Sequence, residues 1–177
     1  MATWLIDPDH SCAAFAIRHM ALAYVRGQFN KLEGAIIYDP AQKSNASVDV
    51  EIDVSRVNTG IKKRDEHLLT DDFFGQPKYP TITFKSTKVD FLDSNRCRVS
   101  GNLTIHGTTK QVLFEGEYAG PKRNPFGDET SVGFSGSTII NREDFGMMWG
   151  SELMEGGGLV AGQEVRIFLD VEADLSE

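Results

Sequence analysis

The stretch SVDVEIDV, residues 47–54, decides the fold class. Its even-numbered positions hold Val, Val, Ile and Val, and its odd-numbered positions hold Ser, Asp, Glu and Asp. Successive side chains of a β-strand point to opposite faces, so this alternation gives one dry face and one face that carries three acids. The stretch is therefore predicted to be a strand that is buried on one side only.

The same period of two recurs along most of the chain. It is strong in RCRVSGNLTIH (96–106) and EVRIFLDVE (164–172), and weaker in NKLEGAIIY (30–38), TITFKST (81–87), KQVLFEGEY (110–118) and SVGFSGSTII (131–140). Gly, Pro, Asn and Asp gather between these segments, as expected of turns. Seven or eight strands joined mostly by short connections predict an antiparallel sandwich or closed barrel, forming one domain over residues 1–177.

One segment breaks the period of two. In GIKKRDEHLLTDDFF (60–74), Ile61, Leu68 and Leu69 stand at i, i+7 and i+8, with Asp65 and Glu66 between them. This spacing predicts one short amphipathic helix near residues 61–70, with the three apolar residues on its dry face and the two acids on its wet face.

Composition and charge exclude several function classes. Of the 177 residues 40% are hydrophobic, and the formal net charge is −8. An acidic surface repels phosphate backbones, so no nucleic-acid partner is expected. No run approaches the roughly 20 apolar residues of a membrane-spanning helix, so no integral membrane protein is expected.

The N-terminal sequence and the two cysteines bear on compartment. The chain enters TWLIDPDHS without a basic and then apolar leader, which predicts a cytoplasmic protein, or a periplasmic one if a leader has been removed. Two buried thiols at Cys12 and Cys97 are then favoured over a disulfide.

Four glycines fall on the apolar positions within predicted strands: Gly34, Gly101, Gly116 and Gly136. A glycine within a strand costs about 0.5–1 kcal/mol relative to alanine, so each needs a reason. One reason is curvature, since a closing barrel needs positions without a Cβ. The other is space, because missing side chains would leave the barrel axis hollow. The residues alone leave both readings open.

The candidate catalytic patterns are weak. His10 and Ser11 are adjacent in a predicted strand, so their side chains point to opposite faces, and there is no G-x-S-x-G motif. The four histidines and two cysteines offer no metal-ligand pair at local spacing, so neither a metal nor a cofactor is expected. Met147, Met148 and Trp149 suit either a yielding pocket mouth or ordinary core filling.

The chain as a whole resembles the YceI-like family of bacterial lipid-binding proteins. The resemblance runs from about Trp4 to Ala173 and rests on these segments: WLIDPDHSCAAFAIRHM, VRGQF, GAIIYDP, VDVEIDVSRVNTGIKKRDEHLLTDDFF, YPTITFKST, GNLTIHGTTKQV, VGFSGSTIINREDFGM and EVRIFLDVEA. It implies an extended antiparallel barrel of about eight strands, similar to lipocalins, with a long apolar pore. It also implies a long-chain amphiphile as ligand, either a polyisoprenoid or an isoprenoid quinone, and it favours the hollow axis for the four glycines.

On this reading, inward-facing apolar side chains bind the tail of the ligand: Phe15, Ile17, Ile36, Val50, Ile52, Phe84, Leu103, Phe114, Phe134, Ile140, Trp149 and Ile167. The polar groups at the strand ends and on the helix, His10, Arg18, His19 and His67, are candidates for the head group, although for Arg18 a salt bridge to one of the many acids is favoured. The expected function is binding and carriage rather than catalysis.

The sequence is also compatible with two other functions and with one oligomeric state. An isomerase or cyclase acting on a bound hydrophobe would use the same His10, Arg18, His19 and His67 as acid, base or anion partner. A stress-response module that binds another protein would use an exposed surface at Met147–Trp149. A homodimer is possible through pairing of sheet edges.

Overall fold

Eleven strand segments in one sheet make up most of the chain, and the computed structural model describes residues 1–176. The elements in chain order are β1 (Ala2–Ile6), β2 (Cys12–His19), β3 (Ala23–Asn30), β4 (Leu32–Tyr38), β5 (Ser47–Asp53), the 3₁₀ turn η1 (Val54–Arg56), β6 (Val57–Asn58), α1 (Lys62–Leu68), β7 (Thr81–Phe91), β8 (Arg96–Ile105), β9 (Thr108–Arg123), β10 (Thr130–Asn141), the 3₁₀ turn η2 (Arg142–Phe145) and β11 (Ala161–Leu175).

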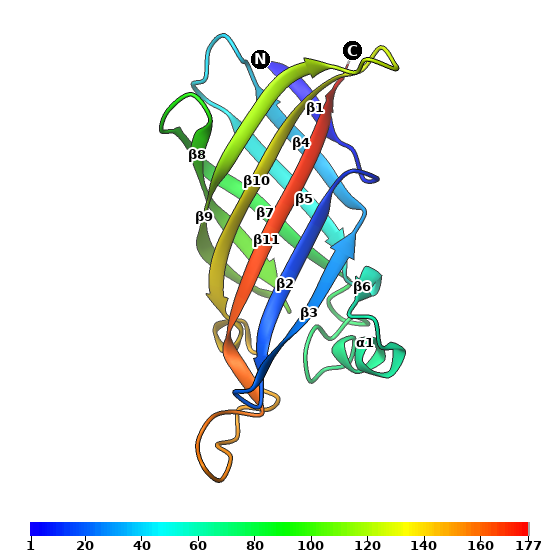
Figure 1. Cartoon of the computed structure of the whole chain (residues 1–177), viewed down its shortest axis with the longest axis vertical. Helices are drawn as coiled ribbons and strands as arrows, with labels where there is room; N and C mark the ends of the chain where they lie inside the picture. The colour runs from blue at the N-terminus through cyan, green and yellow to red at the C-terminus, as the bar shows by residue number, and fades with distance from the viewer. Residues whose placement is uncertain (177) are drawn as a thin grey trace.

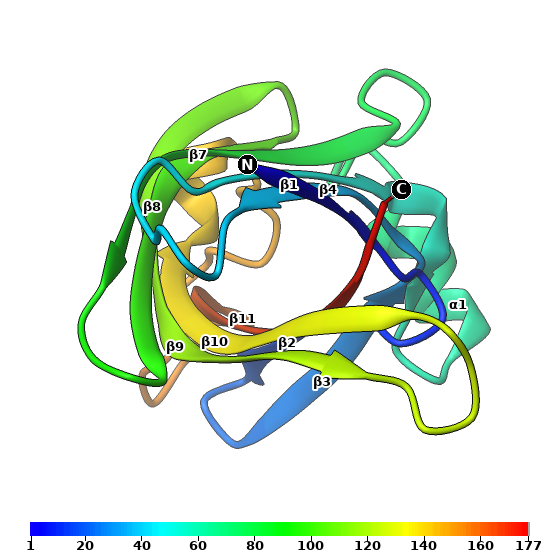
Figure 2. The same cartoon turned by 90° about the horizontal axis from the view of Figure 1, so that it is seen from above.

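The sheet closes on itself as an antiparallel barrel. β1 and β2 lie end to end along β11, through Trp4 opposite Leu175 and Phe15 opposite Ile167. β3 pairs with β2 and β4 with β1, while β6 pairs with β3 and β5 with β4. The segments β1 and β2, β3 and β4, and β5 and β6 therefore share one position each in the barrel wall, and the eleven segments fill eight positions. Figure 1 shows the tilted strands from the side, and Figure 2 shows them as a ring. The predicted all-β barrel of about eight strands is confirmed.

The alternation in the sequence becomes the two faces of the barrel wall. In β5, the side chains of Val48, Val50 and Ile52 face the interior, while Asp49 and Glu51 are exposed. β8 alternates buried and outward positions in the same way, and in β11 the inward residues run from Val165 to Val171. The inward residues of each strand can be identified from the sequence alone, because successive side chains of a strand point to opposite faces.

The predicted helix is present as α1, but its dry face is smaller than expected. Leu68 and Leu69 pack against the core. Ile61 does not, because it is the extended residue that precedes the helix, and its side chain is 53% exposed. Asp65 is half-buried and accepts hydrogen bonds from the backbone N–H and the hydroxyl of Thr59. The placement of Ile61 on the dry face was therefore wrong.

The four glycines allow close approach of neighbouring groups rather than leaving the axis hollow. A Cβ on Gly34 or Gly116 would overlap a backbone carbonyl of the neighbouring strand. A Cβ on Gly101 would lie 2.5 Å from the Phe84 ring, and one on Gly136 would overlap the Phe134 ring. None of the four lines the cavity described below. The expectation that these glycines create the space was wrong, because rings and backbone occupy the positions where side chains would be.

The remaining expectations on the chain concern cysteines and membrane spans. Cys12 and Cys97 are both free thiols, as predicted, but only Cys97 is buried, since Cys12 remains partly exposed. Burial raises the pKa of the Cys97 thiol to about 11, so it stays protonated at neutral pH. Among residues 1–176, no helix combines the length and apolar character needed to cross a membrane.

Candidate functional site: an apolar cavity along the barrel axis

The interior of the barrel is not filled by its own side chains. A cavity of about 370 Å³ runs among the inward-facing residues, which places it within the usual size range of small-ligand sites. All twelve residues predicted to contact a tail line this cavity: Phe15, Ile17, Ile36, Val50, Ile52, Phe84, Leu103, Phe114, Phe134, Ile140, Trp149 and Ile167. Whether they contact a ligand stays a prediction.

The exposure of inward residues agrees with a hollow interior. Ile17, Val50 and Ile167 lie in the middle of strands and face inward, yet each remains partly accessible. Others on the same wall, such as Leu103, are buried against their neighbours. Apolar side chains that face a barrel axis without being covered leave surface that an apolar chain could bury.

The charged lining residues gather at one end of the barrel. Arg18 and His19 close β2, Arg64 and His67 come from α1, and Arg142 begins η2. These elements meet at the lower end in Figure 1, opposite the two termini. Arg18, His19 and Trp149 are exposed, so the cavity reaches the surface here.

Three aromatic rings meet beside this opening. The His67 ring lies edge-on to Phe73 and Trp149, at centroid separations of 5.2 and 4.9 Å, and Phe73 and Trp149 lie 5.3 Å apart. His67 also pairs with Asp72 through Nε2 at 2.7 Å. The 146–160 segment thus serves both functions considered for it: Met147 fills the core, while Trp149, 41% exposed, borders the opening.

Arg142 holds the segment that follows η2 in place. Arg142 is 2% exposed. Its guanidinium donates to the carbonyls of Met147 (2.6 Å), Ala161 (2.9 Å) and Gly162 (2.7 Å), and to the Ser151 hydroxyl (3.3 Å). Burial lowers the pKa of the Arg142 guanidinium, and neighbouring carboxylates oppose that shift. One buried side chain therefore ties both ends of the 146–160 segment to the barrel.

Arg18 makes no salt bridge among the described residues, which removes the alternative considered for it. Its Nη1 donates to the Leu22 carbonyl at 2.8 Å, and its guanidinium stacks on the Tyr24 ring with the carbon 4.5 Å from the ring centre. Arg26 and Arg166 lie over the same ring, at 5.7 and 5.3 Å. Arg18 thus lines the opening, while its guanidinium is engaged by the Leu22 carbonyl and the Tyr24 ring.

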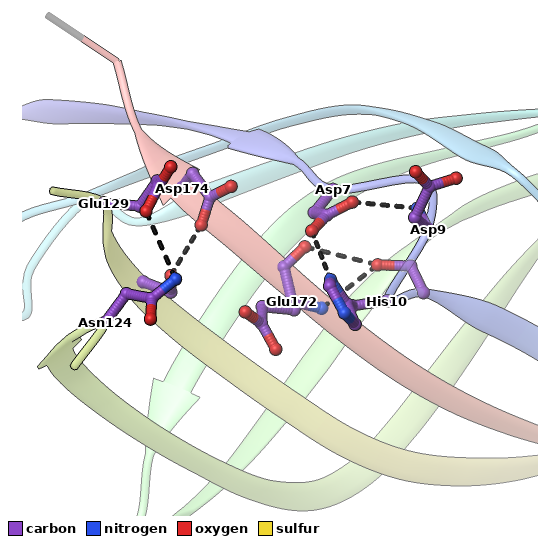
Figure 3. Close-up of polar contacts among 9 residues, drawn as sticks. Asp7, Asp9, His10, Asn124, Glu129, Glu172 and Asp174 are labelled. Carbon is purple, nitrogen blue, oxygen red and sulfur yellow. Dashed lines mark hydrogen bonds and ion pairs between the residues drawn. The ribbon is translucent and has the colours of Figure 1, made fainter. Parts of the chain in front are cut away.

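His10 lies outside the cavity, unlike the other three polar candidates. It belongs to the break between β1 and β2, where its Nδ1 lies 2.5 Å from the Asp7 carboxylate (Figure 3). Asp7, His10 and Glu172 bring three potential ligand atoms within 4.8 Å of one another. Because Glu172 comes from β11, no local spacing in the sequence could reveal this cluster.

We expect the titration of His10 to report its pair with Asp7. The Asp7 hydrogen bond raises the pKa of His10 above its ordinary 6.5, and the same bond lowers the pKa of Asp7 below 3.8. A histidine whose pKa is higher in the folded protein stabilises the fold fully below its unfolded pKa, and this contribution is lost as pH rises through its folded pKa. A carboxyl group whose pKa is lower in the folded protein stabilises the fold fully above its unfolded pKa, and this contribution is lost as pH falls through its folded pKa. The pair therefore contributes most between about pH 3.8 and 6.5.

Proton NMR of the His10 Cε1–H checks this expectation. In Asp7→Asn the midpoint of His10 should return toward 6.5, while Asp9→Asn should shift it less, because Asp9 acts only through space. An unchanged His10 midpoint in Asp7→Asn would show that the pair does not form in solution.

Several lining residues were not anticipated from the sequence. Thr59, Arg64 and Arg142 all line the cavity. Arg64 had a usable signal, since it lies three residues before His67 on the predicted helix and so shares its face. Arg142 had none, because its burial depends on the path of a long loop.

Comparison with known proteins identifies the family of this chain. A family model described as the YceI-like domain matches residues 4–173. The chain belongs to the YceI-like family. A UPF0312 protein of Vibrio cholerae serotype O1 is 36% identical over 148 residues, which cover 82% of this chain and 78% of the relative.

Solved structures of YceI proteins share the barrel. The YCEI protein of Campylobacter jejuni is 31% identical, with a TM-score of 0.76 over 90% of each chain. A polyisoprenoid binding domain from Saccharophagus degradans, implicated in plant cell wall breakdown, has a TM-score of 0.72, with 17% identity over 99% of this chain and 100% of that one. The latter likeness extends to the fold alone.

Proposed function

We propose that this protein binds and carries a long-chain amphiphile, a polyisoprenoid or an isoprenoid quinone, with its tail in the barrel cavity. The observation that carries the proposal is the unfilled apolar interior, about 370 Å³ lined by aliphatic and aromatic side chains. Membership of the YceI-like family and the shared fold of a polyisoprenoid binding domain support a lipid ligand.

The energetics suit a slender apolar chain. Each methylene group moved from water into an apolar site contributes about 0.8 kcal/mol, so a few isoprene units suffice for tight binding without polar contacts. Release would then need either a partner or an apolar phase, and this is the behaviour expected of a carrier.

Uptake by protein stripped of lipid tests the proposal. Trp149 borders the cavity, so its fluorescence should change when prenyl alcohols or a prenyl quinone are added. Affinity should rise from a three-isoprene to a four-isoprene alcohol, because more methylenes are buried. Stripped and folded protein that takes up neither the alcohols nor the quinone would contradict the proposal.

A further inference from the structure

The charges that line the cavity have one sign. The lining holds Arg18, His19, Arg64, His67 and Arg142, and among residues 1–176 it holds no aspartate or glutamate. This is the reverse of the whole chain, which has 26 acidic residues against 18 Lys and Arg. A cleft with low-dielectric walls and charges of one sign concentrates the electrostatic potential at its mouth.

Arg64 is the lining cation that is best prepared to receive a ligand. Its Nε donates to the Thr59 hydroxyl at 2.7 Å and its Nη2 donates to the Thr59 carbonyl at 2.8 Å. Thr59 is fixed in turn by hydrogen bonds to Asp65. The Nη1 group makes no hydrogen bond to the described residues, so the side chain is positioned while two donors stay available.

The acids near Arg64 do not neutralise it. Within residues 1–176, no carboxylate lies within 4.0 Å of its guanidinium nitrogens. Asp65 is engaged by Thr59, Asp72 is engaged by His67, and neither lines the cavity. Arg64 is half-buried and has no carboxylate partner among the described residues, which fits a site whose anion comes from a ligand.

We propose that the ligand carries an anionic head group, a phosphate or a carboxylate, and that Arg64 binds it at the α1 end of the cavity. His67 shares the same face of α1, one turn further on, and borders the opening with Trp149. The tail then extends from this end along the apolar axis. The inference rests on the proposed function, since it names the class of head group for the same cavity.

Arginine suits this task on chemical grounds. Its planar guanidinium presents paired N–H donors to the oxygens of phosphate or carboxylate, and such charge-assisted hydrogen bonds are about twice as strong as neutral ones. A neutral alcohol or quinone offers no charge to the three arginines of the lining, so it forgoes this contribution.

Matched ligands that differ only in the head group test the inference. Geranylgeranyl phosphate is compared with geranylgeraniol, and palmitic acid with its methyl ester, on protein stripped of lipid. We expect each anion to bind at least about tenfold more tightly than its neutral partner, the ratio that one charge-assisted hydrogen bond supplies. The phosphate and carboxylate arms distinguish the two sources of the negative charge.

Three variants assign the preference to a residue. Arg64→Met should bring the ratio close to one by weakening the binding of the anions, and Arg64→Lys should recover part of it. Arg56→Met is the matched control, because Arg56 is exposed, pairs only with Asp53 at 3.9 Å and does not line the cavity. It should leave the ratio unchanged.

The outcomes separate this inference from the proposed function. Equal binding of the charged and neutral ligands by the unaltered protein, or a preference that survives in Arg64→Met, would overturn the inference while the carrier function stands. Failure of the protein to bind any of the four ligands would overturn both.

Discussion

Replacing Val50 with tryptophan is expected to weaken binding of a prenyl chain at least about a hundredfold. Val50 lies in the middle of β5, between Gly34 and Phe84 of the neighbouring strands, and its side chain lines the cavity. An indole ring there takes the place of about four methylenes of tail, each of which contributes about 0.8 kcal/mol. The measurement is the affinity of stripped protein for geranylgeraniol, by Trp149 fluorescence or calorimetry.

Glu51→Trp is the matched control for this variant. Glu51 is the next residue of β5 and is exposed on the outer face. The same ring is added to the same strand, but outside the barrel, so binding should not change. Val50→Trp should remain folded, because the ring enters open space; overpacking a filled core would instead cost about 1–3 kcal/mol. Undiminished binding by folded Val50→Trp would show that the ligand does not occupy the cavity.

Replacing Arg142 with methionine is expected to lower the free energy of unfolding by at least about 3 kcal/mol. The substitution keeps an apolar side chain of similar length but leaves the carbonyls of Met147, Ala161 and Gly162 without their donor. Each buried carbonyl left unpaired costs about 1–3 kcal/mol. Urea unfolding followed by circular dichroism measures the loss.

Two further variants make this expectation specific. Arg142→Lys keeps the charge but not the fork of donors, so it should be intermediate. Arg123→Met removes an exposed arginine that pairs with Asp128, and it should cost at most about 1 kcal/mol. If the urea midpoint of Arg142→Met equalled that of the unaltered protein, Arg142 would not be holding the 146–160 segment.

Alternation in the sequence predicted the wall of the barrel because it is a local property. In β5, β8 and β11 the inward residues could be named directly, and Ile52, Leu103 and Ile167 all line the cavity. What the alternation could not decide was whether an inward face meets other side chains or an empty axis. That depends on the closure of β1 against β11, which joins residues more than 160 positions apart, such as Trp4 and Leu175.

At the polar end of the site, too, some features could be predicted from the sequence and others could not. His67 and Arg64 share a face of one short helix, so their proximity is a local property that the sequence carries. His10 was grouped with Arg18 and His19 because all three were expected at strand ends, yet His10 lies beside Asp7 and Glu172, away from the cavity. Arg142 gave no signal at all, since its acceptors in the 146–162 region are set by the tertiary path of the chain.

The glycines show how a correct conclusion can rest on a wrong reason. The axis is hollow, as the family resemblance implied, but the glycine positions are occupied by neighbouring groups such as the Phe84 ring beside Gly101. The space comes from the width of an eight-position barrel, a size at which side chains either just fill the interior or leave room for one small ligand.

Native mass spectrometry of the protein purified from cells without detergent tests the central claim most directly. The account predicts a species heavier than the chain by the mass of one long-chain amphiphile, and it predicts that organic extraction removes this mass and that Val50→Trp lacks it. A purified, folded protein that carries only the mass of its own chain, and that acquires none when offered a prenyl lipid, would contradict the account.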